Sequence, residues 1–150
     1  MAGETDRQTS NDQTYSDKLA EQRERVAALA AACALDEREL LLELHDAGIR
    51  VTSVWDFIPS GGAPPAAVPI LVAHLARDHH ERIWQGIVRS LTVQHARGSA
   101  LTVLCELYRA ESDRDRRSLL AHAIGAMADM DEVRDLPDIE TFHAVFSTTK

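Results

Sequence analysis

The chain has 150 residues, enough for one domain with a core of its own. Hydrophobic residues make up 45% of the sequence and aromatic residues 5%, with Leu and Ala dominating, a composition that favours helices over sheets. The formal net charge of −8 argues against a general binder of nucleic-acid backbones, because such proteins carry a basic surface.

The N-terminal segment, residues 1–14, is polar and predicts a disordered, mobile tail. It has neither the basic start nor the apolar stretch of a signal peptide, and the chain has no apolar run of about 18 residues that would span a membrane. Cys33 and Cys105 stand alone in apolar helical contexts, as reduced thiols do. We therefore expect a cytoplasmic protein without membrane contact.

Helical spacing of apolar residues begins after this tail and continues along the chain. A first helix is predicted from a cap at Thr14 or Ser16 through Cys33. The second starts at a capping box of Asp36 and Glu39, flanked by Leu35 and Leu40 as a hydrophobic staple, and stops at Gly48. A short helix over residues 52–58 follows, in which Trp55 is expected to plug the junction with the later helices.

Two helical hairpins are predicted after the loop of residues 60–65. The first pairs residues 66–77 with 79–93, with a capping box of Asp78 and Glu81 at the turn, and the second pairs residues 99–110 with 115–128. Pro137 introduces a closing helix near residues 139–146. No segment alternates with a period of two, so no strand is expected. The expected core includes Leu71, Leu75, Trp84, Ile87, Leu91, Leu104 and Ile124.

The two hairpins form an internal repeat. At an offset of 33, Ile70-Leu71-Val72 falls on Val103-Leu104-Cys105, and at an offset of 36 Ile83-Trp84 falls on Leu119-Leu120. Two-helix repeats of this length are typical of solenoids, because one hairpin cannot bury its own apolar face. In these features, and in Pro69 of the first helix, residues 40–127 resemble the HEAT-like (armadillo-type) helical repeat proteins. Residues 66–91 (AAVPILVAHLARDHHERIWQGIVRSL) are the most similar part, whereas Thr102 replaces the proline in the next repeat.

The resemblance implies an all-α fold: a short right-handed α-solenoid of HEAT-like hairpins with an N-terminal helical cap, in one domain over residues 15–150. Tetratricopeptide repeats have a similar period, but their Trp/Leu-Gly/Tyr pattern is absent. A four-helix bundle would need fewer and longer helices. Both alternatives agree with the sequence less well than the HEAT-like interpretation does.

The sequence offers little catalytic chemistry. His74, His79, His80 and Glu81 cluster in sequence, but helical metal motifs place two ligands one turn apart, so we expect no metal and take His79 and His80 as exposed. Ser90 and Cys105 are the candidate nucleophiles near the repeat centre, without an evident base. Gly61-Gly62 precedes prolines rather than a helix, unlike a phosphate loop. We expect no cofactor and no catalysis.

A binding surface is the better functional candidate. In HEAT-like proteins the second helix of each repeat lines a concave groove, and the resemblance implies the same here. Arg82, Gln85 and Arg89 in the first hairpin, with Arg117 and His122 in the second, share the polar phase of these helices. Residues 51–100 hold three acidic and four basic residues, against eleven and six in residues 1–50, so this region suits carboxylates of a partner. Alternatively, these five residues merely solvate the helices.

The predicted function is therefore a non-catalytic protein–protein interaction module whose partner the sequence does not identify. One alternative is an immunity- or antitoxin-like inhibitor of a basic toxin, which the small size and the acidity of the chain would suit. If the groove does not bind the partner, the acidic N-terminal helices with Glu37, Glu39 and Glu43 become the preferred surface. Another is an enzyme on a HEAT-like scaffold that acts on a nucleic-acid base or attaches a chromophore. That alternative predicts a groove rich in Lys and Arg, yet lysine occurs only at Lys18 and Lys150.

Overall fold

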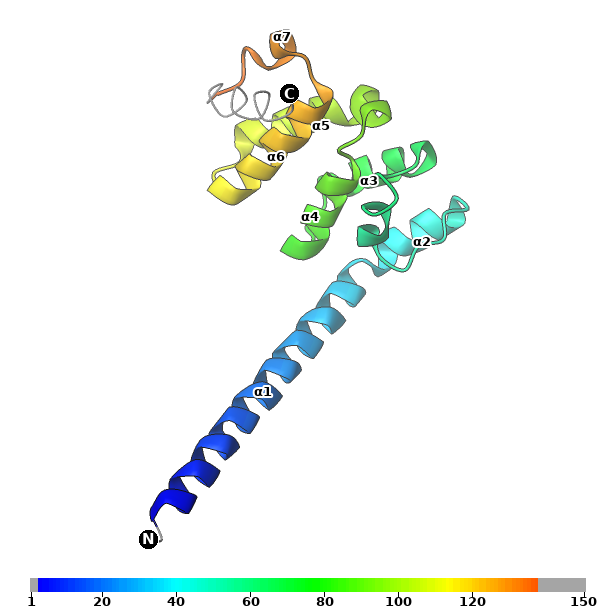
Figure 1. Ribbon diagram of the computed structural model, residues 1–150. Coiled ribbons are helices and arrows are strands. Elements are labelled where there is room, and N and C mark those ends of the chain that lie inside the picture. Colours follow the sequence, from blue (N-terminus) through cyan, green and yellow to red (C-terminus); the bar gives the residue numbers. More distant parts are fainter. Residues whose placement is uncertain (1–2, 138–150) are drawn as a thin grey trace. The chain divides into compact units, whose positions relative to one another are not determined.

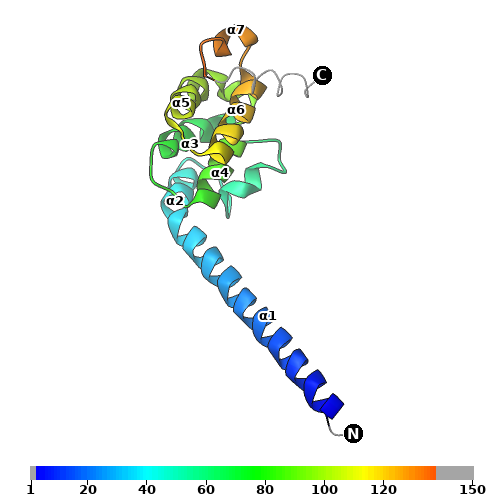
Figure 2. The same ribbon diagram turned by 90° about the vertical axis from the view of Figure 1, so that its left-hand side faces the viewer.

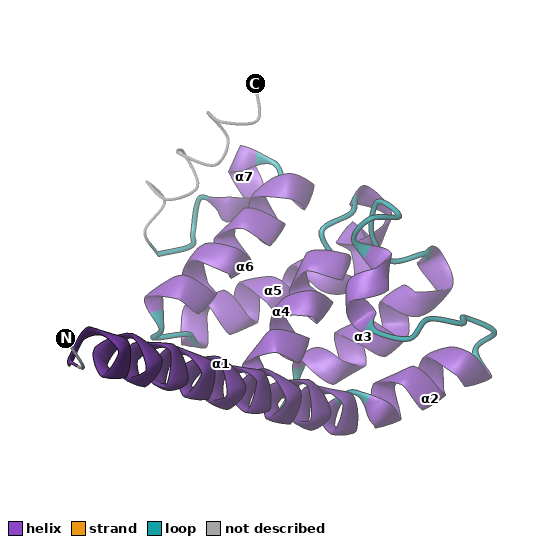
Figure 3. Cartoon of the chain, turned by 60° about the horizontal axis from the view of Figure 1, so that its bottom comes forward, coloured by secondary structure: helices purple, strands orange, loops and turns teal. Residues whose placement is uncertain are grey.

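The computed structural model describes residues 3–137, and in this part of the chain all regular secondary structure is helical, without a strand (Figure 3). The prediction of an all-α protein is confirmed. The closing helix expected at residues 139–146 lies outside the described residues. The chain divides into two compact units, Met1–Leu35 and Asp36–Lys150.

The described part of the first unit belongs to one helix, α1 (Gly3–Asp36), which runs without a break and whose last residue is the first of the second unit (Figures 1 and 2). It starts at Gly3 rather than at the cap expected near Thr14 or Ser16, so residues 3–14, predicted as a tail, are helical. The hydroxyl of Thr14 does not cap the helix, because it donates to the carbonyl of Ser10 at 2.9 Å, in the preceding turn. A side chain that bonds backward in this way belongs to a helix interior and not to an N-cap.

The second unit is built from short helices joined by turns and loops (Figure 1). In chain order these are α2 (Arg38–Asp46), the 3-10 helices η1 (Val54–Phe57) and η2 (Pro65–Ala67), α3 (Val68–Leu75), α4 (Glu81–Ser90), the 3-10 helix η3 (Gln94–Ala96), α5 (Arg97–Ala110), α6 (Arg114–Met127) and α7 (Met130–Val133). Both expected hairpins are present, as α3 with α4 and α5 with α6. In addition, the first helix of one hairpin contacts the first helix of the other (α3 with α5), and the second helices of the two hairpins contact each other as well (α4 with α6).

The core of the second unit consists of the apolar faces of these helices. All seven residues predicted as core are buried: Leu71, Leu75, Trp84, Ile87, Leu91, Leu104 and Ile124. Val54 of η1 is fully buried as well, and Gly86 of α4 lies directly beneath it, since a Cβ atom at Gly86 would come within 2.7 Å of Val54 Cγ1. The absence of a side chain at Gly86 therefore lets η1 pack against α4.

The two capping boxes expected in this part of the chain do not form. Glu37, not Asp36, is the N-cap of α2, without a side-chain cap bond, and Leu35 is 73% exposed, so the predicted staple is absent. His80, not Asp78, caps α4, and its Nδ1 accepts from the backbone N–H of Arg82 at 3.2 Å. At the first of these boxes the local pattern is overridden, because Asp36 accepts hydrogen bonds from His79 Nδ1 and from the His80 N–H.

Candidate functional site

The residues predicted to bind a partner lie on the second helices, as expected, but not on one surface. Arg82, Gln85 and Arg89 follow each other at three- and four-residue spacing, so they share one face of α4. Arg82 and Arg89 are exposed. Gln85 is half-buried, and its amide donates to the carboxylate of Glu81 at 3.2 Å.

Arg89 and His122 come together in a hollow between α4 and α6. Two adjoining depressions share Arg89, Leu119 and His122: one of ≈320 Å³, completed by Ile58, Gly61, Gly62 and Thr92, and one of ≈380 Å³, completed by Asp115 and Ser118. We call this surface the α4–α6 groove. It places a guanidinium and an imidazole beside the apolar side chain of Leu119, with the carboxylate of Asp115 at the rim.

One wall of the α4–α6 groove depends on glycine. Gly61 and Gly62 have φ of +89° and +112°, and the Gly62 N–H donates to Phe57 O at 2.9 Å. A Cβ atom on Gly62 would collide with Val93 Cγ1. The turn after η1 thus passes close to the end of α4, where Ala63 N–H donates to Ser90 O at 2.8 Å.

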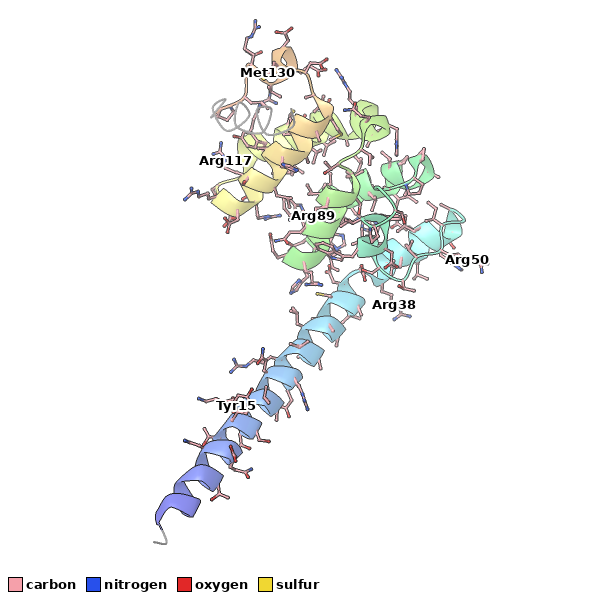
Figure 4. The ribbon with its side chains drawn as sticks, viewed as in Figure 1. Tyr15, Arg38, Arg50, Arg89, Arg117 and Met130 are labelled. Carbon is pink, nitrogen blue, oxygen red and sulfur yellow. The ribbon has the colours of Figure 1, made fainter. Side chains whose placement is uncertain are left out.

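Arg117 points away from the α4–α6 groove. Its guanidinium carbon lies 4.8 Å from the ring centroid of Tyr108 in α5. Since successive helical residues are rotated by about 100°, Arg117 and His122, five positions apart, project from different faces of α6. Figure 4 labels Arg89 on α4 and Arg117 on α6. Of the five predicted residues, Arg89 and His122 line the groove, Arg82 and Gln85 extend its α4 face, and Arg117 belongs to the α5 side.

Two cation–aromatic contacts on this side of the molecule were not predicted. The guanidinium carbon of Arg116 lies 3.9 Å from the ring centroid of the buried Trp84, and its Nε is 3.5 Å from Glu81 Oε2. The Arg82 guanidinium lies 5.4 Å from the Trp55 ring, whose Nε1–H donates to Arg82 O at 3.2 Å. Trp84 is thus a core residue, as expected, and Arg116 joins α6 to α4.

A hydrogen-bonded network of two buried histidines, flanked by the partly exposed carboxylates of Asp36 and Glu43, is a polar feature that the sequence did not reveal. Asp36 Oδ2 is 2.9 Å from His79 Nδ1, His79 Nε2 is 2.9 Å from His74 Nδ1, and His74 Nε2 is 3.2 Å from Glu43 Oε1. The His74 side chain is fully buried and that of His79 is 6% exposed, so the expectation that His79 is exposed is wrong. The reason is that Asp36, at the end of α1, holds the imidazole in the interior.

The contacts of His74 accommodate a neutral imidazole. His79 bridges Asp36 Oδ2 and His74 Nδ1 through its two ring nitrogens, and His74 Nε2 lies 3.3 Å from Arg77 Nη1, from which a neutral ring accepts a hydrogen bond. The same Arg77 nitrogen donates to Glu43 Oε1 at 3.1 Å. Burial and the nearby Arg77 lower the pKa of His74, which agrees with a neutral ring.

The remaining candidate chemical groups are engaged in structural roles. The Ser90 hydroxyl lies 2.7 Å from Gly86 O and 3.1 Å from Val54 O, and it is fully buried. Burial raises the pKa of the Cys105 thiol, which disfavours the reactive thiolate. Within residues 3–137, no cluster of three or more His, Cys, Asp or Glu side chains has the arrangement of a metal site.

The acidic residues considered as an alternative binding surface, Glu37, Glu39 and Glu43, also make contacts within the protein. Glu37 is 5% exposed, and its Oε2 accepts from the Val54 N–H and the Ser53 hydroxyl, both at 3.2 Å. Burial raises the pKa of Glu37. Glu43 contacts His74 and Arg77, and Glu39 lies 3.3 Å from Arg77. These three carboxylates therefore do not form one open patch.

Comparisons with models of protein families, with curated proteins and with solved structures found no match to this chain. Among the described helices, none has both the length and the apolar character needed to cross a membrane.

Proposed function

We propose that this chain is a non-catalytic protein-interaction module that binds an acidic segment of another protein through the α4–α6 groove. The observation that carries the proposal is that Arg89 and His122, from the second helices of two hairpins, line one hollow beside Leu119. Arginine pairs with carboxylates through two parallel hydrogen bonds, and Leu119 offers an apolar contact for the same segment. Asp115 at the rim favours a partner whose acidic groups lie toward Arg89 rather than toward the start of α6.

The proposal includes a HEAT-like architecture for the two hairpins. Three observations support it: the repeat offsets of 33 and 36 residues, the contact of α3 with α5, and the contact of α4 with α6. Helices in equivalent positions of successive repeats pack on each other in a solenoid, and such stacking produces extended binding surfaces. In this interpretation α1 and α2 precede the repeats, and α4 and α6 carry the partner.

The test uses a charge reversal with a matched control. Arg82→Glu/Arg89→Glu changes the α4 face, whereas Arg38→Glu/Arg50→Glu makes the same change in net charge at two exposed arginines outside the groove, on and after α2 (Figure 4). Both pairs should keep the helicity and thermal stability of the parent, because exposed charges contribute little to folding. Partners are captured on the parent chain from the native host and identified, and their affinity for each variant is then measured with purified proteins.

We expect the parent and the Arg38/Arg50 control to bind alike and the Arg82/Arg89 variant to lose at least about tenfold in affinity, since like charges then face the partner. Equal binding by all three proteins would refute the groove as the binding surface. Binding of DNA at low salt that disappears in the Arg82/Arg89 variant would instead favour the nucleic-acid alternative. A basic partner that binds all variants more tightly than the parent would favour the inhibitor of a basic toxin.

A further inference from the structure

The first unit carries an apolar stripe that is independent of the α4–α6 groove. Tyr15, Leu19, Val26 and Leu29 of α1 are 67%, 36%, 60% and 44% exposed. Together with Gln22 they recur at alternating spacings of four and three residues, which is the a/d spacing of a coiled coil. A shallow hollow of ≈440 Å³ lies on this helix alone and is lined by Leu19, Gln22, Arg23, Val26, Ala27 and Ala30. Tyr15 is labelled on α1 in Figure 4.

Charges are sorted around this stripe by sign. At about 100° per residue, Lys18 and Arg25 border one edge of the stripe and Arg23 the other. These are the g and e positions if Leu19 and Val26 are a positions. The acidic residues Asp17, Glu21 and Glu24 lie on the opposite side of the helix. Residues 15–29, with three acidic and three basic residues, therefore present an apolar seam with basic edges and an acidic outer face.

We propose that α1 docks an amphipathic helix of another protein that has apolar a and d positions and acidic e and g positions. Residues at e and g select coiled-coil partners by charge, so basic edges on α1 call for acidic edges on the partner. A second copy of this chain fits less well. In a parallel pair, Lys18 of one copy would face Arg23 of the other, and in an antiparallel pair basic edges would also meet basic edges.

The acidic outer face of α1 argues against a membrane as the occupant. Helices that lie on anionic lipid carry Lys and Arg across their polar face. Here Asp17, Glu21 and Glu24 occupy the centre of that face. A protein helix contacts the seam and its two edges and leaves these acids in solvent.

The experiment measures binding of two labelled synthetic helical peptides to the whole chain by fluorescence anisotropy. Both peptides have about three heptads with Ile at a and Leu at d, and they differ in having Glu or Lys at e and g. We expect the Glu peptide to bind the parent chain and the Lys peptide to bind at least about tenfold more weakly, because like charges then meet at both edges.

Three variants locate the binding. Lys18→Glu/Arg23→Glu/Arg25→Glu should reverse the preference between the two peptides, and Val26→Asp should abolish binding of both. Asp17→Asn/Glu21→Gln/Glu24→Gln, the matched control on the outer face, should change the affinity by less than about twofold, because those side chains point away from the partner. Circular dichroism of each variant checks that the helix is retained.

The proposal is overturned if the parent binds both peptides equally or neither of them, or if Val26→Asp binds like the parent. It is also overturned if the parent sediments as a dimer that Val26→Asp dissociates, since the occupant is then a second copy. Cosedimentation with vesicles of phosphatidylglycerol that Val26→Asp removes would assign the stripe to lipid. Because none of these variants touches Arg82 or Arg89, each of these outcomes leaves the test of the α4–α6 groove unaffected.

Discussion

Replacing Gly86 by Ala is the sharpest test of how the second unit packs. A Cβ atom at this position would lie 2.7 Å from Val54 Cγ1 and 2.9 Å from Trp55 Nε1, closer than atoms of these types approach. Overpacking of a core costs about 1–3 kcal/mol, while exchanging Gly for Ala in a helix interior returns about 1 kcal/mol. We therefore expect Gly86→Ala to lower the free energy of unfolding by up to about 2 kcal/mol, measured by urea denaturation followed by circular dichroism.

Gly98 provides the matched control, because it also lies in a helix but has no atom within 4 Å of the position that a Cβ atom would occupy. Gly98→Ala should stabilise the protein by up to about 1 kcal/mol. In a Val54→Ala background the methyl group that opposes the new Cβ atom is gone, so Gly86→Ala should cost less there, with a coupling of about 0.5–3 kcal/mol. If Gly86→Ala stabilised the protein as much as Gly98→Ala does, η1 would not pack against α4 as described.

Three further predictions concern the core and its buried ionisable groups. Ile87→Ala and Leu104→Ala, both at fully buried sites, should each cost about 2–5 kcal/mol in urea denaturation, and losses below about 1 kcal/mol would mean that these faces are not core. Stability should fall as pH drops below 6.5, because unfolded His74 then gains a proton that burial disfavours in the folded state, whose pKa is lowered. His74→Gln should remove that pH dependence, and an unchanged slope would contradict a neutral buried imidazole. Glu37, whose pKa burial raises, should weaken the fold as pH rises above 4.5, and Glu37→Gln should abolish this loss while its amide oxygen still accepts from Val54. If the Glu37→Gln variant lost as much stability above pH 4.5 as the parent does, Glu37 would not be the group responsible for the loss.

Helix positions and the core could be predicted because both follow from local periodicity. Apolar residues at three- and four-residue spacing place Ile87, Leu91, Leu104 and Ile124 on the inner faces, and all four are fully buried. The same reasoning fails at the first helix, where the polarity of residues 1–14 predicts a tail although the backbone is helical from Gly3. Apolar periodicity detects a helix through the face that it buries, and residues 9–14 are all exposed.

The α4–α6 groove was predicted in part, for a similar reason. Helical phase correctly groups Arg82, Gln85 and Arg89, because they lie on one helix. It does not fix how α6 is rotated relative to α4, and this rotation decides which residues of α6 face the groove. His122 faces it, while Arg117 lies over Tyr108.

In the Asp36–His79–His74–Glu43 hydrogen-bond network, long-range tertiary contacts outweigh the local preference of Asp36 for helix capping. In sequence, Asp36 and Glu39 match a capping box, whose loss costs about 1 kcal/mol, whereas hydrogen bonds to charged groups contribute about 1.5–3 kcal/mol each. Asp36 accepts two such bonds, from His79 Nδ1 and from the His80 N–H, across 43 and 44 residues. The neighbouring Glu37 likewise accepts from Ser53 and Val54. Two successive carboxylates thus hold the start of the second unit, one against the beginning of α4 and the other against η1. Asp36 and Glu37 therefore each connect the start of the second unit to groups distant in sequence.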